Sequence, residues 1–266
     1  MFENTIKQTL AASRTAWGIS LPDASEFVAA LSVNAGPDFL WVDLEHRPYE
    51  VDQIRWIPII CRRKNCACVV RPAGLDPQLI KKALDIGANT LMIPQVNTAE
   101  EAALAVRYAK YPPEGSRGIS PLWTFFMDVS WDDYLPAANR ETAIIVQIET
   151  PEGMKNLDAI AAVEGVDVVF AGPMDLSASL GHIGQPRHPK VLRFLEDFPE
   201  RVRRAGKAAG VTFGDPKQCQ EAWEQGFRFI SCGNLLSHGD QGTREMLANF
   251  RALENGGARP AGKRER

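Results

Sequence analysis

Eight short runs of apolar and β-branched residues recur along this chain, each followed by a longer segment with helical periodicity. This alternation is typical of parallel strands joined by crossover helices. A chain of 266 residues also suits one (β/α)₈ barrel, which needs about 250 residues. The sequence therefore predicts an α/β fold with a single closed barrel. The predicted strands are residues 15–20, 39–44, 67–71, 90–94, 143–149, 166–171, 210–213 and 227–231.

Start and stop signals support helices between these runs. Pro77 opens one segment and Gly87 closes it, which matches the preference for proline in the first helical turn and glycine just past the last. Thr98 followed by Glu101 has the pattern of a capping box before an alanine-rich segment. Both patterns predict helices that run between consecutive strands.

Two stretches depart from the alternation. Residues 111–140 contain several prolines and aromatic residues and are too long for a plain connection, so we expect a lid or an oligomer contact there. The chain from Asn255 onward is rich in glycine and charged residues, and we expect a disordered tail at 256–266. This divides the chain into a barrel domain at 1–255 and the tail.

Charge and composition exclude several classes of function. The net charge of −3 and pI near 5.9 give no bulk reason to expect nucleic acid or an anionic membrane as a partner. There is no apolar run of about 18 residues and no leader pattern at the start of the chain. We therefore expect a soluble, cytoplasmic protein that acts on a small molecule.

The polar residues at the predicted strand ends carry the functional information, because the active site of a (β/α)₈ barrel lies at the carboxyl ends of its strands. Asp43 and Glu45 are two residues apart, as are Gln147 and Glu149, so each pair projects to one side of its strand. Arg71 ends the third strand. We expect these side chains to meet at the mouth of the barrel.

Glu149 and Asp175 follow neighbouring strands, and their oxygens offer the hard ligands that magnesium or manganese prefers. Two protein ligands leave positions for water and for a bidentate substrate such as a 2-oxo acid. Both acids also have structural interpretations. Asp175 could cap a short helix at 176–180, and Glu149 could be the ion-pair partner of Arg71.

His46 is a candidate for proton transfer. Asp43, three residues earlier, could accept a hydrogen bond from one ring nitrogen and leave the other to act as a general base. Schiff-base chemistry would need a lysine inside the barrel, but every lysine falls in a predicted helix, loop or tail. Enolate chemistry at a metal is favoured.

The strand-end residues lie in motifs that resemble the HpcH/HpaI family of class II, metal-dependent pyruvate aldolases. The resemblance covers about residues 15–245 and implies a TIM barrel with an exchanged C-terminal helix. Its motifs are Trp41-Val42-Asp43-Leu44-Glu45-His46, Val70-Arg71-Pro72, Leu84-Asp85-Ile86-Gly87-Ala88, Tyr111-Pro112-Pro113 with Arg117-Gly118, Val146-Gln147-Ile148-Glu149-Thr150 and Gly172-Pro173-Met174-Asp175-Leu176.

The resemblance implies a divalent cation, Mg²⁺, Mn²⁺ or Co²⁺, bound by Glu149 and Asp175 and chelated by pyruvate. It further implies that Arg71 stabilises the enolate oxygen and that His46 with Asp43 moves the proton of the aldehyde hydroxyl. The remaining substrate-binding positions would orient the 2-oxo acid or hold its carboxylate through backbone amides. They are Gln147, Gly172, Pro173, Met174 and Asp175.

The resemblance also implies a homo-oligomer, a trimer or hexamer, in which Asp85 approaches a neighbour's site. The chain departs from the family pattern where an arginine is missing between 119 and 131 and where Met174 replaces a small residue. These departures leave the aldehyde partner open, while the residues for the pyruvate half are all present.

Three functions remain open on the sequence. The first is a lyase that cleaves or forms 4-hydroxy-2-oxo acids. The second is decarboxylation of oxaloacetate, or capture of the enolate by an unusual acceptor as in the related macrophomate synthase, for which the same metal and Arg71 would serve. The third is a barrel that has lost turnover and only binds, although the presence of both acids, Arg71 and His46 argues against it.

Overall fold

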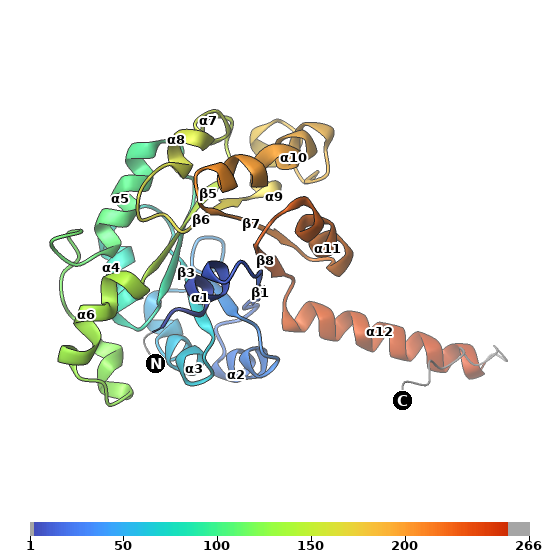
Figure 1. The fold of residues 1–266 in the computed structure, drawn as a ribbon. Coiled ribbons are helices and arrows are strands. Elements are labelled where there is room, and N and C mark those ends of the chain that lie inside the picture. The colour runs from blue at the N-terminus through green and yellow to red at the C-terminus, as the bar shows by residue number, and fades with distance from the viewer. Residues whose placement is uncertain (1–2, 255–266) are drawn as a thin grey trace.

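The computed structural model describes residues 3–254 and shows one closed barrel of eight parallel strands (Figure 1). Strands pair in chain order, and the last pairs with the first. Every predicted strand is present, with ends shifted by no more than two residues, so the predicted fold class is confirmed. The strands are β1 (Ala16–Ser20), β2 (Phe39–Asp43), β3 (Ala67–Arg71), β4 (Thr90–Ile93), β5 (Ala143–Ile148), β6 (Val168–Ala171), β7 (Ala208–Phe213) and β8 (Phe229–Cys232).

Helices connect the strands and surround the barrel. The predicted capping box of Thr98 and Glu101 is present, and Gly87 adopts a left-handed φ of 111° just past its helix. The helices are α1 (Thr5–Ala11), α2 (Glu26–Asn34), η1 (Val51–Ile54), α3 (Ile57–Arg63), α4 (Pro77–Asp85), α5 (Ala99–Ala109), η2 (Leu122–Phe126), α6 (Trp131–Glu141), α7 (Pro151–Lys155), α8 (Leu157–Ala161), α9 (Pro173–Ser179), α10 (Pro189–Arg204), α11 (Pro216–Gln225) and α12 (Leu235–Glu254).

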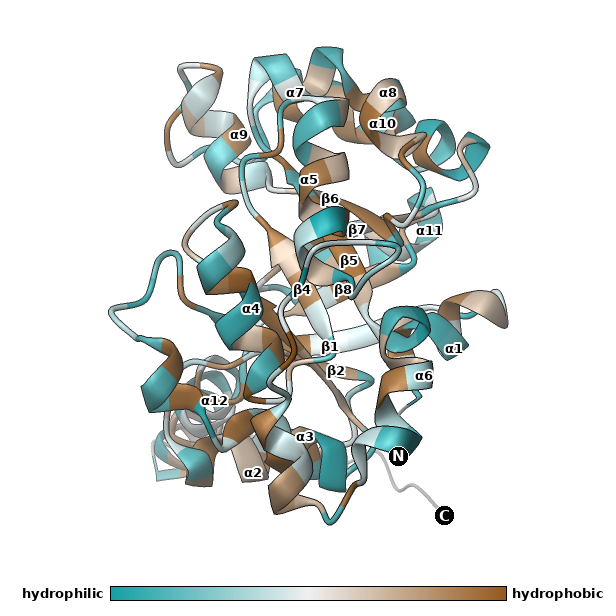
Figure 2. Ribbon diagram, turned by 90° about the vertical axis from the view of Figure 1, so that its left-hand side faces the viewer, coloured by the Kyte–Doolittle hydropathy of each residue, from teal (hydrophilic) through white to brown (hydrophobic). Residues whose placement is uncertain are grey.

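Alternation along the strands divides the core into two layers. Inward residues such as Phe39, Phe170 and Phe229 fill the barrel, and the Phe39 and Phe229 rings stack with their centroids 4.0 Å apart. Outward residues pack against the helices, whose hydrophilic faces turn to solvent (Figure 2). Among the described residues the interior is therefore filled mainly by apolar side chains, and the charged side chains lie near the strand ends.

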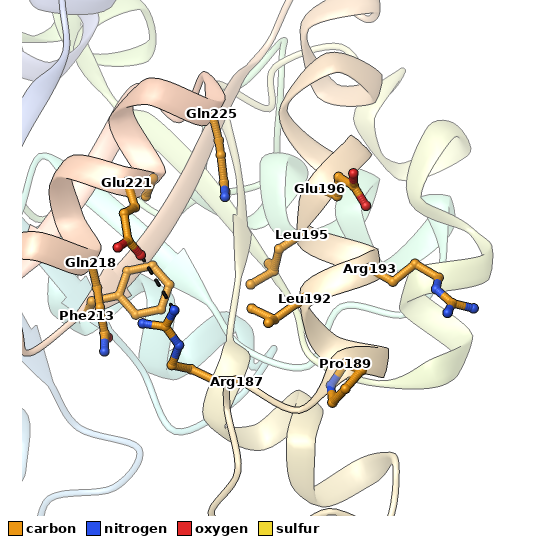
Figure 3. Close-up of a pocket in the computed structure, with 11 residues that line it drawn as sticks. Arg187, Pro189, Leu192, Arg193, Leu195, Glu196, Phe213, Gln218, Glu221 and Gln225 are labelled. Carbon is orange, nitrogen blue, oxygen red and sulfur yellow. Dashed lines mark ion pairs between the residues drawn. The ribbon is translucent and has the colours of Figure 1, made fainter.

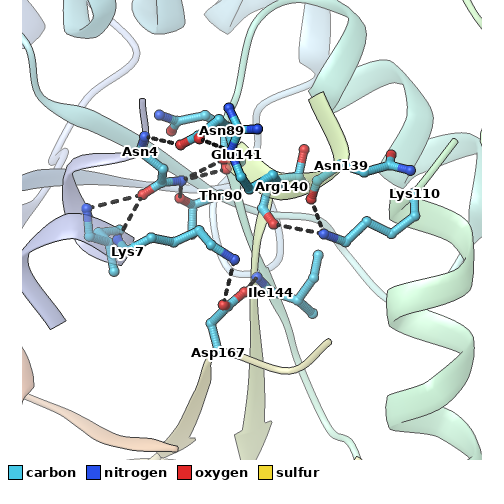
Figure 4. A network of polar contacts seen from close by, with 12 residues as sticks. Asn4, Lys7, Asn89, Thr90, Lys110, Asn139, Arg140, Glu141, Ile144 and Asp167 are labelled. Carbon is cyan, nitrogen blue, oxygen red and sulfur yellow. Dashed lines mark hydrogen bonds and ion pairs between the residues drawn. The ribbon is translucent and has the colours of Figure 1, made fainter. Parts of the chain in front are cut away.

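A polar network fixes α1 across the amino ends of the strands (Figure 4). Asn4 Nδ2 donates to the carbonyl of Asn89 at 2.8 Å and to Thr90 Oγ1 at 2.9 Å. Lys7 Nζ lies 2.7 Å from Asp167 Oδ1, while Asp167 Oδ2 accepts the backbone N–H of Ile144 at 2.8 Å. These contacts stabilise the fold at the amino ends of the strands, which is the role expected of that face in a (β/α)₈ barrel.

The segment 111–140 packs beside the barrel. It contains η2 and α6, and Trp123 is fully buried, with the Arg62 guanidinium 3.9 Å from its ring centroid. A Cβ on Gly87 would lie 2.9 Å from the Trp123 Cβ, so glycine is needed for this close approach. The described contacts join the segment to α3 and α4, which does not support the predicted lid. The alternative, an oligomer contact, stays a prediction.

We expect Trp123→Ala to lower the free energy of unfolding by about 3–5 kcal/mol, because it removes a fully buried aromatic side chain. Leu122→Ala is the matched control, since Leu122 is 52% exposed, and should cost less than about 1 kcal/mol. Urea denaturation of both variants measures this difference. Equal losses would mean that Trp123 does not anchor the segment.

Helix α12 projects away from the barrel (Figure 1). None of its residues is buried, and its described contacts with other elements are mainly with α2. Within residues 3–254 no helix combines the length and apolar character needed to cross a bilayer. The predicted tail at 256–266 lies outside the described residues.

Candidate active site

Asp43, Arg71 and Gln147 extend the rows of side chains that fill the barrel interior. On β2 the row is Phe39, Trp41 and Asp43, since alternate residues face the same side. Asp43 and Arg71 are register partners on β2 and β3. The period-2 pattern thus places an acid, a guanidinium and an amide together at the carboxyl ends, as the sequence predicted.

Arg71 is held from several sides and is only 4% exposed. Its Nε and Nη2 donate to the two Asp43 oxygens at 2.8 and 2.7 Å, and Nη1 donates to Gln147 Oε1 at 3.2 Å. Its guanidinium carbon lies 4.7 Å from the centroid of the Trp41 ring. Burial tends to raise the pKa of Asp43, but the hydrogen bonds and charge of Arg71, with backbone N–H groups, lower it on balance.

Glu149 directly follows β5, and both its oxygens accept hydrogen bonds. Oε1 accepts the backbone N–H of Gln95 at 2.9 Å, and Oε2 accepts Gln147 Nε2. Burial, with the nearby carboxylates of Glu45 and Asp175, raises the pKa of Glu149 to about 7. The interpretation of Glu149 as the ion-pair partner of Arg71 is wrong, because Arg71 pairs with Asp43 and Glu45 instead.

Asp175 lies in the first turn of α9. That helix begins earlier than the predicted 176–180, with Gly172 as its N-cap and no side-chain cap, so the interpretation of Asp175 as a cap is wrong. Its side chain is 46% exposed, and Oδ2 lies 3.8 Å from His46 Nε2. Met174, beside it, is 55% exposed, and Pro173 is buried.

The oxygen ligands fit a hard divalent cation. Glu149 is a buried carboxylate, and the nearby carboxylates of Glu45 and Asp175 oppose its ionisation. A bound cation would instead favour the ionised form. A Cβ on Gly172 would lie 2.7 Å from Glu149 Oε2, so only glycine leaves room beside this oxygen. Among the described residues, no three His, Cys, Asp or Glu side chains are arranged to hold a metal. The carboxylate of Asp175 is close enough to raise the pKa of Glu149, so a cation near both would favour their ionised forms.

The predicted hydrogen bond between Asp43 and the His46 ring is wrong. Asp43 Oδ1 accepts the backbone N–H groups of Glu45 at 3.0 Å and His46 at 3.4 Å, while Arg71 occupies both carboxylate oxygens. The ring Nε2 of His46 instead lies 3.7 Å from Glu45 Oε2. Asp43 therefore shapes the turn after β2 and holds Arg71.

The sequence predicts the position of Glu45 beside Asp43 but no role for it, and it gives no indication that Gln95 belongs to this site. Gln95 donates through its backbone N–H to Glu149 and through Nε2 to Glu45 Oε1 at 3.3 Å. It has a left-handed φ of 53°, which no sequence pattern indicated.

Asp85 is not brought to this site within the chain. It lies in the last turn of α4, toward the amino ends of the strands, where Arg117 Nη2 donates to its Oδ1 at 2.9 Å. Burial raises the pKa of Asp85 although Arg117 opposes the shift. Its predicted approach to a neighbour's site stays a prediction.

A cavity of about 480 Å³ lies outside the barrel between α10 and α11 (Figure 3). Leu195 and Phe213 line it, and Arg187 Nη2 lies 3.7 Å from Glu221 Oε2 across it. It contains none of the predicted site residues. The strand-end group, where charged side chains converge, is the better candidate for chemistry.

A closed barrel that presents a fixed guanidinium, an imidazole and two crowded acids at the carboxyl ends of its strands has the arrangement of a barrel enzyme whose active site lies at that end.

Within that class, the chain belongs to the HpcH/HpaI aldolase/citrate lyase family, whose family model matches residues 17–238. It is 41% identical to the hydroxypyruvate/pyruvate aldolase of Pseudomonas aeruginosa over 93% of both chains. It is 40% identical to the 4-hydroxy-2-oxo-heptane-1,7-dioate aldolase of Klebsiella pneumoniae, over 93% of this chain and 94% of that protein. The predicted resemblance is confirmed, and the chain is a carbon–carbon lyase.

The solved structures agree. The crystal structure of a family protein from Burkholderia cenocepacia superposes with a TM-score of 0.86 and 35% sequence identity. The match covers 93% of this chain and 99% of that one. The likeness therefore extends over the whole barrel rather than over a few motifs.

Proposed function

We propose that this chain is a metal-dependent aldolase that cleaves or forms 4-hydroxy-2-oxo acids, with a pyruvate-like 2-oxo acid and an aldehyde as the partners. The observation that carries the proposal is the bridge made by Gln147. Its Oε1 accepts from Arg71 Nη1 and its Nε2 donates to Glu149 Oε2. One side chain thus links the guanidinium that would stabilise an enolate to a carboxylate that would hold the cation.

Glu149 and Asp175 would hold the cation, which we propose to be Mg²⁺, Mn²⁺ or Co²⁺. When bound there, it supplies positive charge that polarises the keto group of the 2-oxo acid. Arg71 stabilises the negative charge that develops on the keto oxygen as the carbon–carbon bond breaks. Because Asp43 and Gln147 already hold the guanidinium in place, this stabilisation needs no reorganisation.

The first turn of α9 would bind the substrate carboxylate. The first N–H groups of a helix have no partner within it, and here they include those of Met174 and Asp175, after Gly172 and Pro173. At the other end of the substrate, His46 would take the proton of the 4-hydroxyl group in cleavage and return it in synthesis. Its ring is half-exposed and so accessible to an aldehyde.

We also propose a homo-oligomer, a trimer or hexamer, in which α12 is exchanged between copies. In support, α12 exposes Met246 and Phe250, while the barrel exposes Phe27 on α2 and Trp223 on α11. Exchange would cover both apolar surfaces. Asp85 would then approach a neighbour's site, and a monomeric mass in light scattering would remove this part of the proposal. We also propose that the enzyme acts in the cytoplasm.

Pyruvate release from a panel of 4-hydroxy-2-oxo acids and oxaloacetate tests the function, with Mg²⁺, Mn²⁺ or Co²⁺ added or chelated. We expect metal-dependent cleavage of the hydroxy acids that falls by about 10²–10⁴-fold in His46→Ala, because a positioned acid–base group contributes that much. Pyruvate from oxaloacetate alone, with His46→Ala fully active, would instead identify a decarboxylase or an enolate-capturing synthase.

A further inference from the structure

Glu45 lies at the mouth of the barrel, and its buried Oε2 accepts no hydrogen bond from the described residues. Its side chain is 9% exposed. Oε1 accepts from Gln95 Nε2, but Oε2 has no hydrogen-bond donor among the described residues. Two cationic or potentially cationic groups face this oxygen, Arg71 Nη1 at 3.1 Å and His46 Nε2 at 3.7 Å. Buried acceptors nearly always accept a hydrogen bond, so we expect a donor for this oxygen.

The His46 ring is a second donor that can reach this oxygen. Arg71 donates to Asp43 through Nε and Nη2 and to Gln147 through Nη1. Nη1 carries a further N–H and forms an ion pair with Glu45 Oε2 at 3.1 Å, but it makes no hydrogen bond to that oxygen. The ring of His46 has no described hydrogen bond, and its Nε2 needs to approach Glu45 Oε2 by less than 1 Å to make one. Rotation of a half-exposed imidazole achieves such a shift at little cost.

Neither of the other acids near His46 serves equally well. Asp43 has both oxygens engaged by Arg71 and one of them also by backbone N–H groups. Asp175 lies 3.8 Å from the ring, but it is 46% exposed and is one of the two proposed ligands of the cation. Glu45 has a largely covered side chain close to the ring and no proposed role at the cation.

Gln95 holds Glu45 in this place. It follows β4 with a left-handed φ of 53°, which few residues other than glycine and asparagine adopt readily. Asn97 Nδ2 donates to the Gln95 carbonyl at 2.9 Å, and the Gln95 backbone N–H donates to Glu149. This backbone conformation directs the carboxamide to Glu45 Oε1 at 3.3 Å, which leaves Oε2 for the ring.

We propose that Glu45 is the positioning residue for His46 and that Gln95 fixes Glu45. The inference rests on the proposed function, in which His46 moves the proton of the 4-hydroxyl group. A carboxylate that takes one ring N–H sets the tautomer and the orientation of the imidazole and leaves the other nitrogen for the substrate. The alternative is that Glu45 merely balances the charge of Arg71.

Two reactions that form the same enolate distinguish these alternatives. Cleavage of a 4-hydroxy-2-oxo acid requires removal of the hydroxyl proton, whereas decarboxylation of oxaloacetate forms the same pyruvate enolate with loss of CO₂ and no hydroxyl proton to remove. A residue that acts through His46 must therefore slow cleavage more than decarboxylation. A residue that acts through Arg71 must slow both.

The experiment compares Glu45→Gln with Asp43→Asn in the full chain with saturating Mn²⁺. We expect the ratio of kcat/KM for cleavage to kcat/KM for decarboxylation to fall about tenfold or more in Glu45→Gln, as for loss of an orienting partner. Asp43→Asn should lower both rates, because it weakens the support of Arg71. The amide oxygen of the new side chain can still accept the backbone N–H groups of Glu45 and His46, so the turn is kept and the ratio should stay within about twofold. Gln95→Leu, which keeps the backbone N–H, should lower the ratio in the same direction by a smaller factor.

A double variant completes the test. In a His46→Ala background, Glu45→Gln should change the ratio no further, since residues that act as one unit are not additive. An unchanged ratio in Glu45→Gln, or a further full effect in His46→Ala, would overturn the proposal in favour of charge balance. A loss of Mn²⁺ affinity in Glu45→Gln, measured by calorimetry, would also overturn it and place Glu45 at the cation.

Failure of the proposed function has a different signature. It would appear in the wild type as no metal-dependent cleavage of any hydroxy acid, or as a His46→Ala variant with an unchanged ratio. If Glu45→Gln does not fold, Gln95→Leu and Glu45→Asp carry the comparison, because Gln95 is exposed and its side chain makes no described contact with Arg71. An unchanged ratio in both would overturn the proposal.

Discussion

Arg71→Met is expected to slow both hydroxy-acid cleavage and oxaloacetate decarboxylation by about 10²–10³-fold, as for removal of one oxyanion donor. Both reactions pass through an enolate, and Arg71 is the guanidinium fixed beside the proposed cation ligands. The two rates should fall together, unlike the selective loss in His46→Ala. Steady-state kinetics with both substrates measure this.

Arg71→Lys is the matched control for Arg71→Met. It keeps a positive charge between Asp43 and Glu45 but loses the paired hydrogen bonds to Asp43, so activity should stay low while the fold is retained. Thermal unfolding of both variants shows whether Arg71→Met fails through instability, because it leaves two buried carboxylates uncompensated. Nearly full activity of Arg71→Lys would mean that only charge matters there.

The barrel was predictable because its signals are local and repeated. Alternating apolar runs such as 143–149 mark a strand by composition, and the same alternation assigns Asp43 and Gln147 to the interior row before any contact is known. Closure of eight parallel strands then brings the row ends together. This is why the acids, Arg71 and His46 were correctly expected at one mouth.

The pairing among these side chains was not predictable, because a carboxylate has limited hydrogen-bonding capacity and its neighbours compete for it. The short sequence separation suggested Asp43 as the hydrogen-bond partner of the His46 ring. Arg71, from another strand, instead donates to both Asp43 oxygens. Gln95 enters the site through a left-handed backbone that nothing in its sequence context indicates. The packing of Trp123 against Gly87 likewise depends on contacts between distant segments.

The second prediction with a large effect concerns the bound cation, and Glu149→Gln is the variant that tests it. We expect this change to lower hydroxy-acid cleavage by about 10³-fold or more, because a cation contributes several kcal/mol of charge stabilisation. Wild type treated with a chelator should lose activity equally and regain it on addition of Mn²⁺, whereas Glu149→Gln should not. Glu152→Gln, an exposed acid three residues later, is the matched control and should retain activity.

Stability supplies a readout that is independent of turnover. Burial, Glu45 and Asp175 raise the pKa of Glu149 to about 7, above its ordinary value, so the ionised carboxylate destabilises the metal-free fold and stability falls as pH rises through 7. At pH 8 with chelator, Glu149→Gln should therefore unfold at or above the melting temperature of the wild type. Mn²⁺ should raise the melting temperature of the wild type and of Glu152→Gln but not of Glu149→Gln. An equal Mn²⁺ shift in all three would place the cation elsewhere and remove Glu149 from its ligands.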